Sequence, residues 1–114
     1  MADKTLFERI IAREIPATII YEDERCIAFN DTNPQAPFHA LVVPTKPIPK
    51  VSDAEVADAS LLGHLLIVAA QVAREAGYGE AFRMAINNGA GAGQSVFHVH
   101  VHVLAGRPLS WPPG

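Results

Sequence analysis

Near its C-terminus the chain reads Phe97-His98-Val99-His100-Val101-His102-Val103, an alternation of apolar residues and histidines. Because side chains alternate between the two faces of a β-strand, this pattern predicts a strand with three histidines on one face, and with Phe97 and the valines buried on the other. Three of the five histidines in the chain stand here, so chance explains their spacing poorly. Successive histidines on such a strand lie about 6 to 7 Å apart, twice the rise per residue.

The histidine face has three interpretations. A solvent-exposed face is usually made of residues such as Thr, Lys or Glu, so that reading is weak. A zinc site can take two imidazoles from one strand and a third ligand from elsewhere, but His98 and His102 would be about 12 Å or more apart and could not share one ion. A histidine nucleophile needs an acceptor that holds the N–H of its second nitrogen and so fixes the tautomer. We favour the nucleophile and keep the metal site as the second interpretation.

A glycine-rich segment, Gly89-Ala90-Gly91-Ala92-Gly93-Gln94-Ser95, precedes the histidines. Glycines let the backbone approach an anion closely and turn N–H groups toward it. The segment is not a dinucleotide-binding fingerprint, because it lacks the third glycine at the required spacing and leads into a predicted strand. Alone it would be a hairpin loop, but beside three histidines it indicates phosphorus chemistry. Ser95 either helps a phosphate or leaving group as a donor or simply closes the loop.

The remaining elements follow from apolar periodicity and turn residues. Pro16 ends a short helix, Gly77 ends a long one, and Asp53 or Ser60 acts near the start of the long helix. Hairpin strands around one long helix, without βα alternation, indicate an α+β fold with an antiparallel sheet. The expected helices are 5–14 and about 58–76, and the expected strands are 17–22, 26–30, 40–43, 82–87 and 95–104.

Size and composition indicate one globular domain spanning residues 1–114, with 49% hydrophobic and 18% charged residues. A net charge of −3 gives no basic surface for nucleic acid. The single cysteine, Cys26, excludes an internal disulfide and fits a reducing compartment. The N-terminus lacks a secretory h-region, and the longest apolar run, Leu65 to Ala70, is much shorter than the roughly 20 residues that span a bilayer. We therefore expect a cytoplasmic protein with no membrane partner.

His98 to Val103 matches the His-φ-His-φ-His-φ motif, φ being apolar, that gives the histidine-triad (HIT) family its name. Further stretches resemble the Hint branch of that family, and together they cover nearly the whole chain; they are 7–16, 34–39, 61–64, 93–100 and 106–114. The resemblance implies a five-stranded antiparallel sheet with one long and one short helix. It also implies a two-fold homodimer in which the two sheets join into one of ten strands.

The resemblance further implies a hydrolase that cleaves the P–N bond of purine nucleoside phosphoramidates, such as adenosine or guanosine 5′-monophosphoramidate and aminoacyl-AMP-like adducts. His100 would be the nucleophile and would form a covalent nucleotidyl-histidine intermediate. His102 would contact the phosphate, the His98 carbonyl would hold the His100 tautomer, His39 would complete the histidine cluster, and Ser95 would serve the leaving group. No cofactor and no metal are implied.

Substrate-binding residues also carry over from the resemblance. Asp31 would bind the ribose hydroxyls, although on its own it reads as a turn carboxylate. An apolar slot for the purine would be formed by residues that otherwise read as core, namely Leu6, Phe7, Ile10 and Phe29. The phosphate and its linkage would meet Asn87, Gly93 and Gln94. Asn30 and Thr32, which differ from the His and Ile common in vertebrate members, lie near the pocket and leave base preference open.

Trp111 would, by the same resemblance, reach toward the site of the partner subunit, although it can equally be a packing anchor. Three other functions stay open. The first is a dinucleoside polyphosphate hydrolase or nucleotidyl transferase of the same family, which the Trp-Pro-Pro-Gly ending disfavours. The second is a nucleotide-binding regulatory adaptor, and the third is the zinc hydrolase.

Overall fold

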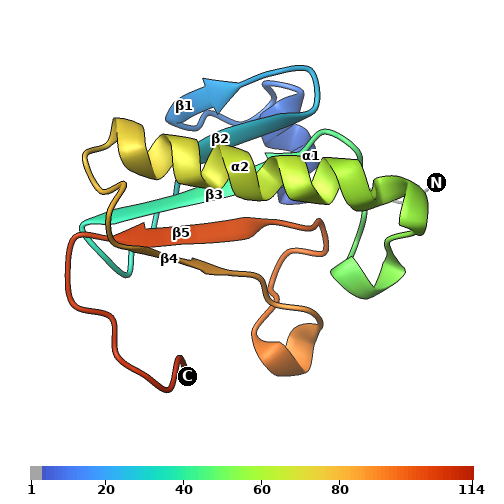
Figure 1. Ribbon diagram of the computed structural model, residues 1–114. Coiled ribbons are helices and arrows are strands. Elements are labelled where there is room, and N and C mark those ends of the chain that lie inside the picture. Colours follow the sequence, from blue (N-terminus) through green and yellow to red (C-terminus); the bar gives the residue numbers. More distant parts are fainter. Residues whose placement is uncertain (1–3) are drawn as a thin grey trace.

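The computed structural model describes residues 4–114 (Figure 1). Two helices and five strands make up the fold; they are α1 (Leu6–Ile11), β1 (Ile19–Glu22), β2 (Cys26–Asn30), β3 (Phe38–Pro44), α2 (Ala59–Glu75), β4 (Phe82–Ala85) and β5 (Val101–Ala105). The strands form one antiparallel sheet in the order β1-β2-β3-β5-β4. The predicted α+β class and five-stranded antiparallel sheet are confirmed.

The two faces of the sheet carry separate apolar clusters. On one face α2 packs through Leu65, Val68 and Val72 against small and branched residues of β2, β3 and β5 (Figure 1). On the other face α1 contributes Phe7 and Ile10, which pack against residues of β2 and β3. The alternation in β5 therefore sends its valines toward α2 and its histidine toward the α1 side.

Helix α1 is held at its start by a capping box. The Thr5 hydroxyl accepts the Glu8 amide at 3.1 Å, and the Glu8 carboxylate accepts the Thr5 amide at 3.0 Å. The helix ends at Ile11, earlier than expected, and Arg13 adopts a left-handed conformation with φ of 62°. This left-handed backbone conformation cannot continue a right-handed helix, so the helix ends before Pro16.

Strand β5 begins at Val101, not at Ser95 as predicted. Val101 pairs with Val42, and Pro44 two residues further along β3 has no N–H to extend the ladder. The Val99 amide donates instead to the carbonyl of Ile48 at 2.7 Å. His98 and His100 thus precede the regular strand and only His102 lies within it.

The prediction that Phe97 is buried is wrong. The chain bends over residues 96–98, and this bend turns the Phe97 side chain outward, leaving it 44% exposed. Val99, Val101 and Val103 are buried against α2 as predicted.

Smaller differences concern element ends. The N-cap of α2 is Asp58, so neither Asp53 nor Ser60 is the cap, while Gly77 follows the helix with φ of 92° as expected. Strand β2 has the predicted bounds, β3 is longer than predicted, and β1, β4 and β5 are shorter.

Within the described residues, Val56–Glu75 is the one helical segment whose length and composition would allow it to cross a membrane. One side of this segment packs on the sheet through Leu65, Val68 and Val72, and that contact accounts for part of its apolar composition.

Replacing Val68 with Ala tests the contact between α2 and the sheet. Val68 is 1% exposed, so the free energy of unfolding should fall by about 2 kcal/mol or more, from roughly 0.8 kcal/mol for each of two buried methyl groups plus the cavity they leave. Urea titration gives the free energy. Val56→Ala is the matched control, because Val56 is 94% exposed and its truncation should change the free energy by less than about 0.5 kcal/mol. Equal effects of the two changes would contradict this account of the core.

Candidate active site

The tautomer of His100 is fixed by the main chain. Its Nδ1 lies 2.8 Å from the carbonyl oxygen of His98, and a carbonyl can only accept, so Nδ1 carries the proton. The neutral ring then has an unprotonated Nε2. His100 is buried and lines a cavity on the α1 side of the sheet. The ring therefore has the form required of a nucleophile or an acceptor.

A second chain of contacts fixes His102 through His39. The Nδ1 of His39 accepts the backbone N–H of Gln35 at 3.0 Å, which places the proton of the neutral His39 ring on Nε2. That nitrogen lies 2.9 Å from Nδ1 of His102 and 3.4 Å from Oδ2 of Asp31. His102 then carries its own proton on Nε2. Two neighbouring rings thus offer opposite groups, a lone pair on His100 and an N–H donor on His102.

His98 lies behind these two rings and is fully buried. Its Nε2 donates to the carbonyl of Pro44 at 2.7 Å, and its Nδ1 lies 3.4 Å from the hydroxyl of Thr5. The side chain ties the bend before β5 to the end of β3 and to the start of α1. His98 does not line the cavity, and its carbonyl is the group that reaches His100.

The four clustered imidazoles are all held in the neutral form. Burial lowers the pKa of His98 and of His100 below the ordinary histidine value, although each ring also donates to a backbone carbonyl. Burial also lowers the pKa of His39. Burial, together with the neighbouring His100 and His39, lowers the pKa of His102 to about 4. At neutral pH the cluster carries no positive charge of its own.

A cavity of about 360 Å³ opens beside this cluster. It joins the α1 side of the sheet to the bend before β5. Ten of the predicted site residues line it: Leu6, Phe7, Ile10, Phe29, Asn30, Asp31, Thr32, Ser95, His100 and His102. Its lining, all within the described residues, includes neither Lys nor Arg. An anionic group in this cavity would meet N–H and O–H donors and not a cationic side chain.

The inner wall of the cavity is aromatic. The ring of Phe7 stands edge-on to Phe29 at a centroid distance of 5.6 Å and to His100 at 4.8 Å. Asp31 closes the polar side, with Oδ1 accepting the Asn33 amide at 2.8 Å and Oδ2 near His39. The cavity therefore combines a flat apolar slot with one partly exposed carboxylate.

The glycine-rich loop is arranged differently from the expectation. The amides of Gly93 and Gln94 donate to carbonyls within the loop, those of Ala90 and Gly89. The Gln94 side chain is buried and donates to the carbonyls of Pro49 and Val96, while its oxygen accepts the Gly89 amide.

Asn87 approaches the Gly93 carbonyl at 3.5 Å. Asn87, Gly93 and Gln94 therefore shape the loop and do not line the cavity. Within residues 4–114 the amide of Ser95 makes no hydrogen bond, and this is the donor that the loop offers beside His100.

Trp111 lies away from the cavity of its own chain. It is 80% exposed and borders a separate surface hollow with Arg83, Met84 and Asn87. The structure does not bring it to His100.

Several residues of the site were not predicted. Ile15, Pro16, Ala17, Leu41 and Val96 also line the cavity. Leu41 had a sequence signal, because it alternates with His39 along β3 and faces His102 across the ladder. Thr5 and the Pro44 carbonyl, which hold His98, had none, because they lie 93 and 54 positions away in the chain.

An antiparallel sheet with this histidine cluster at the start of β5 defines a histidine-triad domain. A family model of the HIT domain matches residues 12–109, and the chain belongs to that family. It is 59% identical, over the full length of both chains, to an uncharacterized HIT-like protein of Synechocystis sp.. It is 48% identical to the 14 kDa zinc-binding protein of Zea mays, over 96% of this chain and 88% of the maize protein.

Among solved structures, the crystal structure of a HIT family hydrolase from Legionella pneumophila Philadelphia 1 superposes with a TM-score of 0.95. The two chains are 43% identical, and the match covers 97% of this chain and 100% of the other. The family expected from the alternating histidines is thereby confirmed.

The lowered histidine pKa values predict a stability that falls in mild acid. Below about pH 6.5 the histidines of the unfolded chain become protonated, whereas those of the folded cluster stay neutral. The free energy of unfolding should therefore decrease as the pH falls from about 7 toward about 4. Urea titrations across this range measure the slope. His102→Asn removes the ring with the pKa of about 4 and should make the slope smaller. An unchanged slope in that variant would show that His102 is not held neutral by the fold.

Proposed function

We propose that this protein hydrolyses the P–N bond of purine nucleoside phosphoramidates through a covalent nucleotidyl-His100 intermediate. The observation that carries the proposal is the 2.8 Å hydrogen bond from His100 Nδ1 to the His98 carbonyl, beside a cavity of about 360 Å³. It leaves Nε2 unprotonated, which is the requirement for attack. The hydrolase name of the Legionella relative supports the reaction class. The cytoplasmic location expected from the sequence is part of the same proposal.

In the proposed complex the purine lies against the apolar wall that Phe7 and Phe29 help to form, and the ribose hydroxyls donate to Asp31. The phosphate oxygens accept the free amide of Ser95 and the Nε2–H of His102. These donors offset the charge that grows on phosphorus, and His102 is preoriented because its Nδ1 is held by His39.

In the first step Nε2 of His100 forms a bond to phosphorus as the P–N bond to the amine breaks. The departing amine takes up a proton from the Ser95 hydroxyl at the cavity wall. In the second step water adds to phosphorus as the bond to Nε2 breaks, and the proton that the water loses returns to the Ser95 oxygen. The nucleoside monophosphate leaves and His100 is neutral again. The carbonyl of His98 stabilises the positive charge that the imidazole carries between the steps.

A metal-assisted hydrolase is the second candidate. Asp31, His39 and His102 each present one ligand atom, and these atoms lie within 4.8 Å of one another. The maize relative is named a zinc-binding protein, which favours the same reading. An ion held there would replace the His39–His102 hydrogen bond, so it would change the donor that His102 presents. Activity that survives removal of metal by a chelator separates the two candidates.

Replacing His100 with Ala tests the nucleophile. Release of AMP from adenosine 5′-phosphoramidate should become undetectable, while AMP still binds, because the rest of the lining, including Phe7, Phe29 and Asp31, is unchanged. His64→Ala is the control, since His64 is the one histidine that lies outside the cluster, and it should retain turnover. Mass spectrometry after a rapid quench in alkaline denaturant, which preserves the acid-labile phosphorus–imidazole bond, should find the nucleotidyl adduct on a peptide that contains residue 100 of the wild-type protein. Undiminished turnover by the Ala variant would refute the assignment.

The same assay resolves the family alternatives. A dinucleoside polyphosphate hydrolase would cleave diadenosine polyphosphate faster than the phosphoramidate. If the protein is an adaptor, both the wild type and the His100→Ala variant should bind nucleotide, and neither should show turnover.

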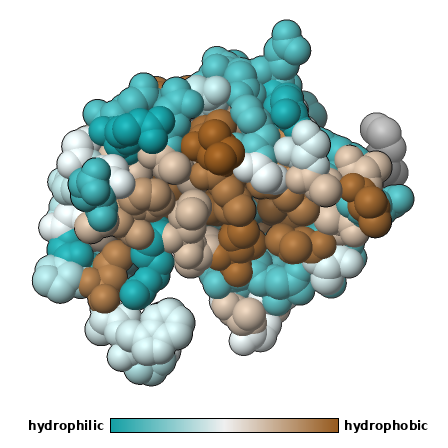
Figure 2. Space-filling view, in the orientation of Figure 1, coloured by the Kyte–Doolittle hydropathy of each residue, from teal (hydrophilic) through white to brown (hydrophobic). Residues whose placement is uncertain are grey.

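We also infer the homodimer with a ten-stranded sheet, in which the β4 edges of two chains pair. Strand β4 is an edge of the sheet, and Met84 within it is exposed. Figure 2 shows apolar side chains gathered on the face of the molecule that α2 covers, and Leu66 and Ile67 of α2 are exposed. Clustered exposed apolar side chains are typical of an interface. Pairing of this kind would let Trp111 reach the cavity of the other subunit.

Placing a charge on this edge tests the dimer. Met84→Glu should bring two like charges together across the two-fold axis and reduce the mass in solution from two chains to one. Light scattering gives the mass. Val56→Glu, at an exposed apolar position elsewhere, should leave it unchanged. A dimer that persists in the Met84 variant would place the interface elsewhere.

A further inference from the structure

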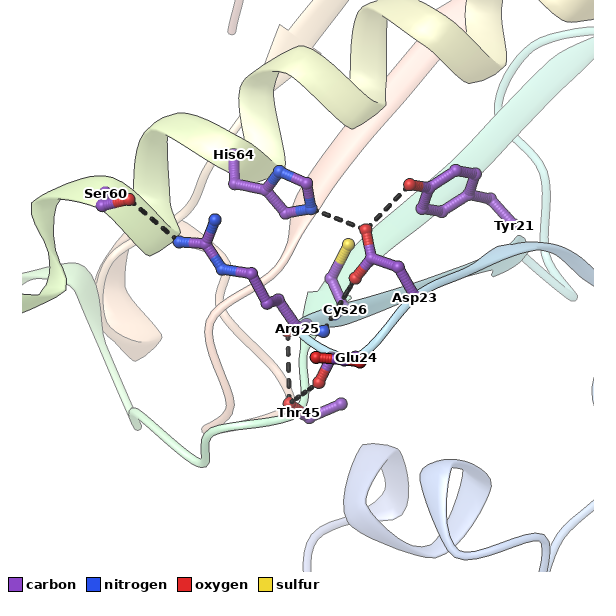
Figure 3. A network of polar contacts seen from close by, with 8 residues as sticks. All are labelled: Tyr21, Asp23, Glu24, Arg25, Cys26, Thr45, Ser60 and His64. Carbon is purple, nitrogen blue, oxygen red and sulfur yellow. Dashed lines mark hydrogen bonds and ion pairs between the residues drawn. The ribbon is translucent and has the colours of Figure 1, made fainter.

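A second cluster of polar side chains lies on the α2 face of the sheet, opposite the cavity. It joins the turn between β1 and β2 to the first half of α2 (Figure 3). Asp23 stands at its centre, with Tyr21, Cys26 and His64 around it. The proposed reaction uses none of these groups.

The carboxylate of Asp23 is oriented by its own hairpin. Its Oδ1 accepts the backbone amides of Arg25 at 2.7 Å and Cys26 at 2.8 Å, and its Oδ2 accepts the hydroxyl of Tyr21 at 2.8 Å. The same Oδ2 lies 2.6 Å from Nε2 of His64 (Figure 3). The two amides and the hydroxyl fix where Oδ2 points, and it points at the imidazole.

The sulfur of Cys26 completes a group of three ligand atoms. Sγ of Cys26, Nε2 of His64 and a carboxylate oxygen of Asp23 all lie within 4.8 Å of one another. Ligands of one tetrahedral ion at bond lengths of about 2.0 to 2.3 Å are separated by about 3.3 to 3.8 Å, so small side-chain shifts suffice to hold an ion. The three residues come from two elements, the hairpin and α2.

Sulfur, imidazole and carboxylate together select the class of ion. A thiolate is a soft ligand that favours zinc and similar ions over Mg²⁺ or Ca²⁺. The side chains of Asp23 and His64 are 27% and 24% exposed, so an ion can enter from solvent, and a water can fill the fourth position. Cys26 is fully buried beneath them.

We propose that Asp23, Cys26 and His64 form a binding site for one zinc-class divalent cation, which links the β1–β2 hairpin to α2. Binding releases the thiol proton of Cys26 to solvent, and the ion takes its place. His64 coordinates the ion through Nε2 and carries its remaining proton on Nδ1. The bond from Nε2 to the ion replaces the present hydrogen bond between Nε2 and Asp23. The site is separate from the histidine cluster, and it holds whether or not the proposed phosphoramidase activity does.

A nucleophilic role for Cys26 with His64 and Asp23 is a weaker reading of the same atoms. The sulfur is fully buried, and burial and the neighbouring Asp23 raise the pKa of the thiol to about 12. A substrate would not reach a protonated thiol at that depth.

Titration of the full-length protein with Co²⁺ under reducing conditions tests the site. A cobalt–thiolate bond absorbs in the near ultraviolet, and Cys26 is the only cysteine in the chain, so this absorption reports on one residue. The wild type should bind one Co²⁺ per chain with this absorption, and Zn²⁺ should abolish it by displacement. His39→Ala, which removes a ligand of the Asp31 group, should keep the absorption.

Two variants remove ligands of the proposed site. Cys26→Ser should lose the absorption entirely, and His64→Ala, a milder change at a partly exposed position, should weaken cobalt binding at least tenfold. Circular dichroism verifies that each variant is folded. The proposal is overturned if the wild type binds no cobalt, if it binds cobalt without thiolate absorption, or if His64→Ala binds as tightly as the wild type.

Discussion

The hydrogen bond from His100 Nδ1 to the carbonyl of His98 is the constraint on which the site depends. It exists because β5 begins only at Val101 and the chain bends just before it. The carbonyl of His98 can therefore face the ring of His100 instead of pairing with a neighbouring strand. His98 keeps that bend in place by donating to Pro44 and by meeting Thr5. The sheet, the short helix and the His100 ring are thus joined through one buried side chain, that of His98.

The sequence predicted the sheet and the cluster because both follow from local periodicity. Alternation alone identified Val101 and Val103 as facing α2, and Val99 obeys it before the ladder begins, whereas Phe97 does not. The apolar slot and Asp31 came from the family resemblance, Ser95 came also from its place beside the histidines, and the cavity does bring them together. Composition and spacing would have left Phe7, Ile10 and Phe29 as ordinary core.

The parts that escaped prediction depend on where hydrogen bonds go, which no periodicity records. Nothing local indicates that the Gln94 side chain holds the glycine loop by donating to the carbonyl of Pro49. Nor does anything local indicate that the pairing of β3 with β5 stops before Pro44 and that the bend which follows leaves Phe97 exposed. The partner of His64 is 41 positions away, so the Asp23 cluster appears only after the hairpin and α2 have packed. Long-range contacts of this kind arise from tertiary packing and leave no signal in the local sequence.

Main-chain atoms decide the proton positions on His39, His98 and His100, and His39 passes that decision on to His102. Backbone amides and carbonyls do not mutate, so exchanges among the side chains that line the cavity leave the proton positions on these rings unchanged as long as His39 is kept. Asn30 and Thr32 line the cavity without touching this relay. Substrate preference in such a domain can therefore drift during evolution while the reactive nitrogen stays as it is.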